Sequence, residues 1–174
     1  MNAEHLNLSV DTQVRDASAA DGEALAHIYN HYILNTVATF EEQALPGAQM
    51  ALRVQKIQRE EALPWLVAES GGTVVGYAYA TQWKQRSAYC CSTETTVYLE
   101  PDCCGRGTGA LLYERLLAAL RTLGIHLAIG GIALPNEASV ALHEKFGFEK
   151  VAQFREIGLK FGRWIDVGYW QKFL

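Results

Sequence analysis

The sequence has little of what marks membrane proteins, nucleic-acid binders or secreted disulfide-rich domains. No apolar run among its 174 residues approaches the roughly 20 that a membrane helix needs. The first twelve residues lack the basic start and apolar run of a secretory signal. The formal net charge is -4, so the basic face of a nucleic-acid binder is not expected. The composition predicts a cytoplasmic protein whose partner is neither a membrane nor a nucleic acid.

Cysteine is also scarce, with four residues in two adjacent pairs, Cys90-Cys91 and Cys103-Cys104. Zinc sites usually separate paired cysteines so that both thiolates can face one ion. Neighbouring residues of a strand point to opposite faces, and a reducing compartment disfavours disulfides. We therefore expect free, buried thiols and no metal site.

What is present fits one folded domain. Apolar residues make up 49% of the chain and charged residues 20%, which is ordinary for a globular protein with one core. We expect residues 1–12 to form a flexible tail and residues 13–174 a single domain.

Hydrophobic periodicity and turn residues predict an α+β fold with a mixed sheet rather than a doubly wound one. Helices are expected at about residues 21–32, 47–60, 107–123 and 136–146. Strands are expected at 13–16, 65–69, 73–80, 88–99, 127–132, 148–157 and 164–173.

A glycine-rich loop precedes the clearest helix, with the sequence Gly105-Arg106-Gly107-Thr108-Gly109. Glycines let the backbone approach a ligand, and a helix start offers free N–H groups and partial positive charge. This combination suits a pyrophosphate, with Arg106 adding a full charge. A dinucleotide fingerprint or a P-loop would need other surroundings. From the loop alone, a tight turn capping the helix is an equal alternative.

The loop resembles the signature (R/Q)-x-x-G-x-(G/A) of the GNAT superfamily of N-acetyltransferases. Cys104 stands where Arg or Gln is usual, which removes one side-chain contact but leaves the backbone cradle. The segments TETTVY at 93–98 and KFGRWIDVGYWQ at 160–171 resemble the phosphinothricin and methionine sulfoximine N-acetyltransferase branch. The similarity runs over nearly the whole chain and implies the GNAT fold, a central, mostly antiparallel, twisted sheet flanked by helices.

The resemblance also implies acetyl-CoA as co-substrate. The pantetheine arm would lie along Val97, Tyr98 and Leu99, where a splayed strand offers N–H groups to the thioester oxygen. Asn136 would hydrogen-bond this arm, or simply cap its helix. The pyrophosphate would lie on Gly105, Arg106, Gly107, Thr108, Gly109 and Ala110.

Two residues are candidates for proton transfer. A carboxylate in mid-strand is unusual, and the family assigns the residue matching Glu94 as general base for the amine. The alternative is a surface carboxylate. His143 stands where many relatives carry a proton-donating Tyr, and it would protonate the leaving thiolate. The alternative is a histidine packed against the sheet.

Recognition of an anionic group on the substrate is assigned to Lys84 and Arg86, with Gln85 between them. A solvated loop is the usual fate of such charges. Gly131 and Ala133 differ in size from the phosphinothricin enzymes, so the exact substrate is open. Other substrate-pocket positions implied by the resemblance are Phe40, Tyr79, Tyr89, Glu94, Thr95 and Thr96.

The sequence thus predicts an acetyl-CoA-dependent N-acetyltransferase acting on the amine of a small amino-acid-like substrate. Direct transfer in a ternary complex is favoured, because Cys90, if on the strand face of Glu94, would lie about 13 Å away. A peptide N-acetyltransferase and a non-catalytic acetyl-CoA sensor are the alternatives. Relatives suggest a homodimer.

Overall fold

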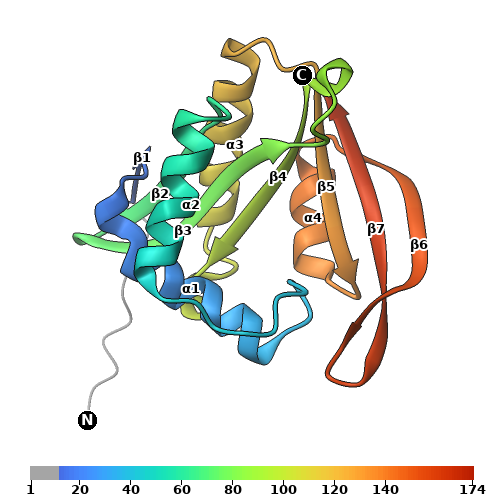
Figure 1. Cartoon of the computed structure of the whole chain (residues 1–174), viewed down its shortest axis with the longest axis horizontal. Helices are drawn as coiled ribbons and strands as arrows, with labels where there is room; N and C mark the ends of the chain where they lie inside the picture. Colours follow the sequence, from blue (N-terminus) through green and yellow to red (C-terminus); the bar gives the residue numbers. More distant parts are fainter. Residues whose placement is uncertain (1–11) are drawn as a thin grey trace.

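The computed structural model describes residues 12–174. The expected flexible tail at residues 1–12 therefore lies outside the described residues, except for Thr12. A seven-stranded sheet crosses the molecule in the order β1-β2-β3-β4-β5-β7-β6 (Figure 1). Only the β4–β5 pair is parallel. The α+β fold with a mixed, mostly antiparallel sheet flanked by helices is confirmed.

The helices cover both faces of the sheet, α1 and α2 on one and α3 and α4 on the other (Figure 1). The helices are α1 Gly22–Asn35, α2 Gly47–Arg59, α3 Thr108–Thr122 and α4 Glu137–Lys145. The strands are β1 Gln13–Asp16, β2 Trp65–Ser70, β3 Thr73–Gln82, β4 Ser92–Leu99, β5 Leu127–Leu134, β6 Glu149–Lys160 and β7 Arg163–Phe173.

Helix α3 shows why the sequence folds locally as it does. Leu112, Leu116 and Leu120 recur at a spacing of four, and all three are fully buried against the sheet. Gly107 begins the helix and Gly124 follows its end, both with positive φ angles of 89° and 74°. Glycine adopts this left-handed backbone without the penalty that a side chain brings.

The strand expected at 88–99 begins only at Ser92. A short 3-10 turn covers Ser87–Tyr89, where Cys90 N–H donates to the Ser87 carbonyl at 3.1 Å. Trp83 N–H donates to the Ser92 carbonyl at 3.1 Å and closes the loop at the strand start. The prediction that Cys90 shares a strand face with Glu94 is therefore wrong, because local turn bonds replace strand pairing there.

The parallel pair is short. It runs only from Ser92 opposite Leu127 to Glu94 opposite Ile129. Beyond this point β4 continues to Leu99 paired with β3, and β5 continues to Leu134 paired with β7, but the two strands no longer pair with each other and diverge (Figure 1). The splay expected from the resemblance is confirmed, and it opens the sheet at its centre.

Candidate active site

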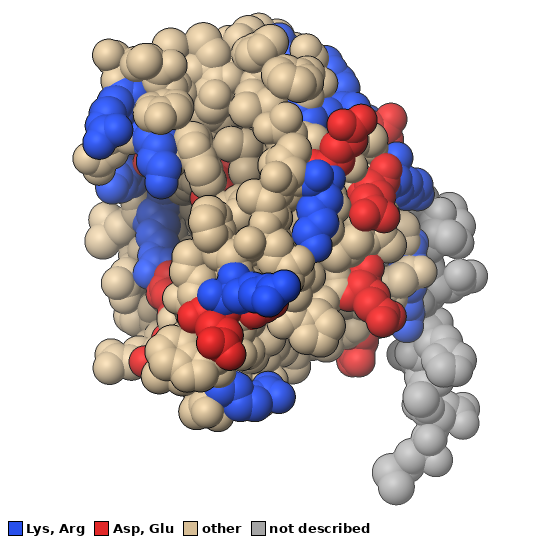
Figure 2. Space-filling model, turned by 90° about the vertical axis from the view of Figure 1, so that its right-hand side faces the viewer, with Lys and Arg blue, Asp and Glu red and all other residues tan. Residues whose placement is uncertain are grey.

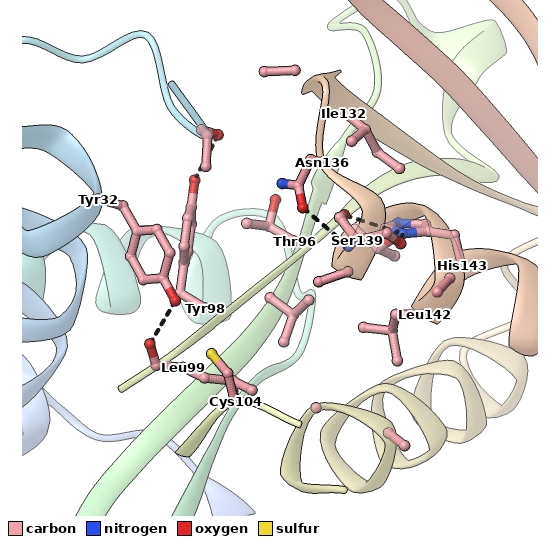
Figure 3. A pocket seen from close by; sticks show the side chains of 18 of the residues that line it. Tyr32, Thr96, Tyr98, Leu99, Cys104, Ile132, Asn136, Ser139, Leu142 and His143 are labelled. Atoms are coloured by element: carbon pink, nitrogen blue, oxygen red, sulfur yellow. Dashed lines mark hydrogen bonds between the residues drawn. The ribbon is translucent and has the colours of Figure 1, made fainter. Parts of the chain in front are cut away.

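A cleft of about 650 Å³ fills the gap between the diverging strands. The loop after α1, the glycine-rich loop and α4 form the rest of its wall (Figure 3). The structure thus brings together much of the predicted cofactor and catalytic set. The predicted residues that line the cleft are Glu94, Thr95, Thr96, Val97, Tyr98, Leu99, Gly105, Gly107, Gly109, Ala110, Asn136 and His143.

The glycine-rich loop turns its backbone toward open space. Gly105 and Gly107 have φ angles of 74° and 89°, and a Cβ on either would meet no atom within 4 Å. The N–H groups of the first turn of α3 follow directly. Arg106 is exposed and Thr108 is buried, and both belong to the loop without lining the cleft.

Asn136 caps α4, which is one of the two roles predicted for it; the other is a hydrogen bond to the pantetheine arm. Its Oδ1 accepts a hydrogen bond from the Ser139 N–H at 3.1 Å. In Figure 3 the amide nitrogen of Asn136 faces away from α4, toward the side of the cleft formed by β4. The cap therefore leaves the amide donors free to meet a ligand in the cleft.

Two tyrosines that the sequence reasoning treated differently form one wall. Tyr98, assigned to the pantetheine arm, and Tyr32, which was missed, have ring centroids 4.9 Å apart. The Tyr32 hydroxyl donates to the Leu99 carbonyl at 2.7 Å (Figure 3). Burial raises the pKa of Tyr32 to about 12, so this hydroxyl keeps its proton. Tyr32 was missed because a tyrosine on the apolar face of a helix is expected to belong to the hydrophobic core.

Glu94 lies at the last paired position before the splay, half-buried on the cleft wall. Burial raises the pKa of its carboxyl, and the nearby Lys84 ammonium opposes this rise. Within residues 12–174, no donor hydrogen-bonds to this carboxylate and no cation lies within ion-pair distance. A Cβ on Gly131 would come within 2.8 Å of its Oε1, so that glycine makes room for it.

His143 is buried, and both its ring nitrogens have partners. Nδ1 lies 2.7 Å from the Ser139 carbonyl, which can only accept, so Nδ1 carries a proton. Nε2 lies 2.7 Å from the Tyr113 hydroxyl, which in turn lies 2.6 Å from Thr95 Oγ1. Burial lowers the pKa of the imidazole, which favours the neutral ring.

Thr95 Oγ1 also lies 3.1 Å from the Ile129 carbonyl oxygen, so its single proton is shared between this carbonyl and the Tyr113 hydroxyl. Thr95 is the first residue of β4 beyond the last parallel pair, and Ile129 is the β5 residue of that pair. Side chains thus link α4, α3, β4 and β5 where the sheet opens. The Thr95 side chain is engaged in this chain rather than directed at a substrate, while Thr96 faces the cleft (Figure 3).

The other predicted substrate residues lie outside the cleft lining. Lys84, Gln85, Arg86 and Tyr89 are exposed on the loop at 83–91. Phe40 packs against Gly158 of β6. Tyr79 stacks on Trp65 at 4.2 Å and lines a separate cavity of about 250 Å³.

An aromatic pair beside Glu94 was missed by the sequence reasoning. Trp83 and Tyr169 meet edge to face at 5.8 Å, and Tyr169 flanks Gly131 next to the Glu94 carboxylate. The Lys84 Nζ lies 4.7 Å from the centre of the Trp83 ring. Trp83 and Tyr169 are 86 residues apart in the sequence, so their contact cannot be predicted before the pairing of β5 with β7 is known.

A splayed parallel pair, a glycine-rich loop at a helix start and a desolvated carboxylate meet at the cleft. The family model described as an acetyltransferase (GNAT) domain matches residues 14–168. The chain therefore belongs to the GNAT acetyltransferases, and it is an N-acetyltransferase.

Individual relatives agree with this assignment. A phosphinothricin N-acetyltransferase of Streptomyces coelicolor is 37% identical, over 94% of this chain and 97% of that protein. An L-methionine sulfoximine/L-methionine sulfone acetyltransferase of Salmonella typhimurium is 35% identical, over 91% and 92%. A solved phosphinothricin acetyltransferase of Sinorhizobium meliloti, in complex with acetyl-CoA, is 38% identical with a TM-score of 0.90, covering 94% of this chain and 88% of that one.

Two further findings concern the described residues alone. None of their helices is both long and apolar enough to cross a membrane. They also hold no cluster of three or more side chains suited to binding a metal ion.

Proposed function

We propose that this enzyme transfers the acetyl group of acetyl-CoA to the amine of a small amino-acid-like substrate of the phosphinothricin, methionine sulfoximine or methionine sulfone type. The observation that carries the proposal is Glu94, a desolvated carboxylate without a hydrogen-bond or ion-pair partner among residues 12–174, beside the opening of the sheet. A substrate ammonium supplies the missing partner. Once the carboxylate has taken the proton of that ammonium, directly or through water, the amine can attack.

Acetyl-CoA fits the remaining features of the cleft. The backbone of Gly105 and Gly107 and the start of α3 would hold its pyrophosphate, with Arg106 adding charge. The stretch of β4 that no longer pairs with β5 would hold the pantetheine arm, together with Asn136. When bound, acetyl-CoA supplies the thioester that is attacked.

The backbone of the splay would stabilise the transition state. Beyond Glu94 the N–H groups on the inner side of β4 have no partner on β5, so they can face the oxyanion of a tetrahedral intermediate. Direct transfer then needs no enzyme nucleophile. Cys90, the rival nucleophile, lies in the loop before β4 and does not line the cleft.

His143 is carried in this proposal as the proton donor for the leaving thiolate. It lines the cleft from α4, yet its Nε2 is bonded to Tyr113 and its imidazole is kept neutral by burial. Because the proton of the neutral ring is on Nδ1, Nε2 must first take up a proton from solvent, and the Tyr113 hydroxyl must turn away from Nε2 to allow this. Tyr113 thereby becomes part of the same proposal.

Substrate recognition is assigned to the surface beside Glu94. Lys84 and Arg86 are the cations for a carboxylate, phosphinate or sulfoximine group, and Lys84 is close enough to affect the Glu94 pKa. The aromatic pair of Trp83 and Tyr169 offers an apolar wall next to them. Gly131, whose missing side chain makes room for the Glu94 carboxylate, keeps this group beside Tyr169 at the wall of the site.

The proposal includes a homodimer in the cytoplasm. Edge strand β6 is exposed along nearly its whole length, and exposed apolar side chains line the β6–β7 hairpin. Figure 2 views this side of the molecule, where surface without charged side chains extends between groups of Lys and Arg and groups of Asp and Glu. The exposed apolar residues of the hairpin are Val151, Phe154, Ile157, Leu159, Phe161 and Trp164. A second copy would cover them, and a reducing compartment would keep the four free cysteines as thiols.

The deciding experiment measures CoA release with acetyl-CoA and a panel of amines. The panel holds phosphinothricin, methionine sulfoximine, methionine sulfone, standard amino acids and a short peptide. We expect turnover of the first group, and Glu94→Gln should lower kcat by about a hundredfold or more while acetyl-CoA binding persists. Glu60→Gln, at an exposed glutamate beyond α2, is the control. Turnover of the peptide alone would refute the small-substrate proposal, and acetyl-CoA binding without any turnover would indicate a sensor.

A further inference from the structure

Two adjacent thiols lie in contact on the surface next to the proposed substrate site. The Sγ atoms of Cys90 and Cys91 are 3.4 Å apart, and both residues are exposed. The prediction of buried thiols is therefore wrong for these two, because they lie in a surface turn and not in a strand. They occupy the turn between the loop that carries Lys84 and Arg86 and the start of β4. The proposed mechanism uses neither thiol.

The second pair of adjacent cysteines is arranged differently. Cys103 is buried, whereas Cys104 is exposed and its Sγ donates to the Glu100 carbonyl at 3.7 Å. These two side chains meet different surroundings, as expected for neighbours in a chain. The contact between Cys90 and Cys91 is thus a property of their turn, and adjacency in sequence does not by itself produce it.

We propose that Cys90 and Cys91 are a redox modification site, at which a hydroperoxide converts the two thiols into a reversible disulfide. The Cys90 thiolate attacks the peroxide, the O–O bond breaks, and a sulfenic acid forms as the first water leaves. The Cys91 sulfur then attacks the Cys90 sulfur, and the hydroxide displaced from the sulfenic acid leaves with the Cys91 proton as a second water. Two thiols are oxidised and hydrogen peroxide is reduced to two waters.

The order of these steps follows from the contact between the two thiols. The hydrogen bond between the two sulfurs raises the pKa of the Cys91 thiol, so Cys91 retains its proton and serves as the resolving thiol. Exposure gives the peroxide access to Cys90, and the short separation places the resolving thiol beside the sulfenic acid at once. Disulfide formation is therefore faster than further oxidation of the Cys90 sulfenic acid to a sulfinic acid.

The disulfide should be easily reduced. Adjacent Cα atoms lie about 3.8 Å apart, whereas disulfides usually join Cα atoms about 4.4–6.8 Å apart. A bridge between neighbours is therefore strained, and strained, exposed disulfides are the labile ones. Cellular thiols would restore the two free cysteines.

Formation of the bridge should alter the substrate loop. The Cys91 carbonyl accepts hydrogen bonds from the N–H groups of His126 at 2.9 Å and Leu127 at 3.1 Å. Closing the ring changes the backbone angles of Cys91, which displaces its carbonyl and weakens this anchor to β5. This consequence rests on the proposed function, which assigns substrate recognition to Lys84 and Arg86 on that loop.

The chemical test uses the full-length protein, treated with hydrogen peroxide, alkylated and cleaved after glutamate. Glu94 and Glu100 separate the two cysteine pairs into different peptides. We expect the peptide with Cys90 and Cys91 to lose two hydrogen atoms and escape alkylation until dithiothreitol is added. The peptide with Cys103 and Cys104 should never form the bridge. Sulfinic acid at Cys90, or a disulfide between chains, would overturn the proposal.

The functional test compares the amine KM of reduced and oxidised enzyme. Oxidation should raise this KM by about threefold or more, with the acetyl-CoA KM unchanged. Cys90→Ser and Cys91→Ser should each abolish the effect of peroxide. A disulfide without any change in KM would overturn the effect on the substrate loop. Because the mass measurement needs no substrate, an enzyme that acetylates none of the amines would refute the proposed function alone.

Discussion

At the scale of the residue, burial of Glu94 sets how activity depends on pH. A general base must be ionised, so kcat/KM should rise with pH through the raised pKa of Glu94 and level off above it. The Lys84 ammonium lowers the pKa of the Glu94 carboxyl, so Lys84→Gln should raise that pKa further. The rising limb of the kcat/KM profile should then move to higher pH. The measurement is kcat/KM against pH.

Arg86→Gln is the matched control, because Arg86 is exposed on the same loop but is not among the causes of the Glu94 shift. Both variants can raise the KM for the amine, but only Lys84→Gln should move the limb. A limb that stays in place in Lys84→Gln would show that another group is titrating.

The buried hydroxyl of Tyr113 yields a second prediction. Tyr113→Phe leaves His143 Nε2 without its partner inside the protein and removes the bond to Thr95. We expect a loss of about 1–3 kcal/mol in the free energy of unfolding, measured with urea. Because Thr95 secures β4 at the splay, kcat should fall as well.

Tyr77→Phe controls for the loss of a buried hydroxyl. Tyr77 is 1% exposed, and its hydroxyl makes no hydrogen bond within residues 12–174. It should leave kcat unchanged and cost less stability. Equal effects of the two substitutions would mean that the chain from Thr95 to His143 contributes nothing specific.

At the scale of the element, the glycine-rich loop combines a backbone requirement with a binding role. Gly107 has a φ of 89° and open space where a Cβ would lie, so Gly107→Ala should cost about 1 kcal/mol through backbone strain alone. The backbone N–H groups of the glycine-rich loop form the proposed anion site, so displacing them should also raise the KM for acetyl-CoA. Unfolding in urea and initial rates measure the two effects.

Gly72 provides the control in the turn between β2 and β3. Its φ is 79° and a Cβ there would also meet no atom within 4 Å. Gly72→Ala should therefore cost similar stability but leave the acetyl-CoA KM unchanged. If both variants raise that KM equally, the effect is loss of stability rather than loss of the cradle.

The elements also show what the sequence could and could not predict. Periodicity located α3 and the strands because their apolar faces are local patterns, and β1 was placed at its observed residues. The start of β4 was predicted four residues early, because Ala88, Tyr89 and two cysteines suit a strand until turn bonds are known. Local propensity does not reveal such bonds.

The residues of the candidate active site divide in the same way, into those visible from local sequence and those visible only in the fold. Glu94 and the glycine loop were found because a charge in a strand and a cluster of glycines are unusual in themselves. The roles of Tyr113 and Tyr169 were not, since a tyrosine on an apolar helix face or in a strand is ordinary core. Their contacts depend on register between segments far apart in the sequence, which only the fold supplies.

At the scale of the whole molecule, the loop after α1, which lines the cleft, contacts the β6–β7 hairpin from the other end of the described chain. Lys160 on β6 is buried and donates from Nζ to the Thr39 carbonyl at 2.6 Å. Phe40 packs beside Gly158 on the same strand. The loop after α1 is thus held by the β6–β7 hairpin, whose outer surface is the apolar one. Association of two copies at this hairpin would therefore stabilise one wall of the cleft.

This coupling makes the oligomeric state the last prediction. Ile157 on β6 is 54% exposed, and a charge there would be buried by the partner in a dimer. We expect the wild type to sediment as a dimer, and Ile157→Lys to sediment as a monomer with a higher amine KM. Leu52→Lys, at a residue of α2 that is 65% exposed, should remain a dimer. A wild type that is monomeric at assay concentrations would refute the dimer, and the hairpin would then require another partner.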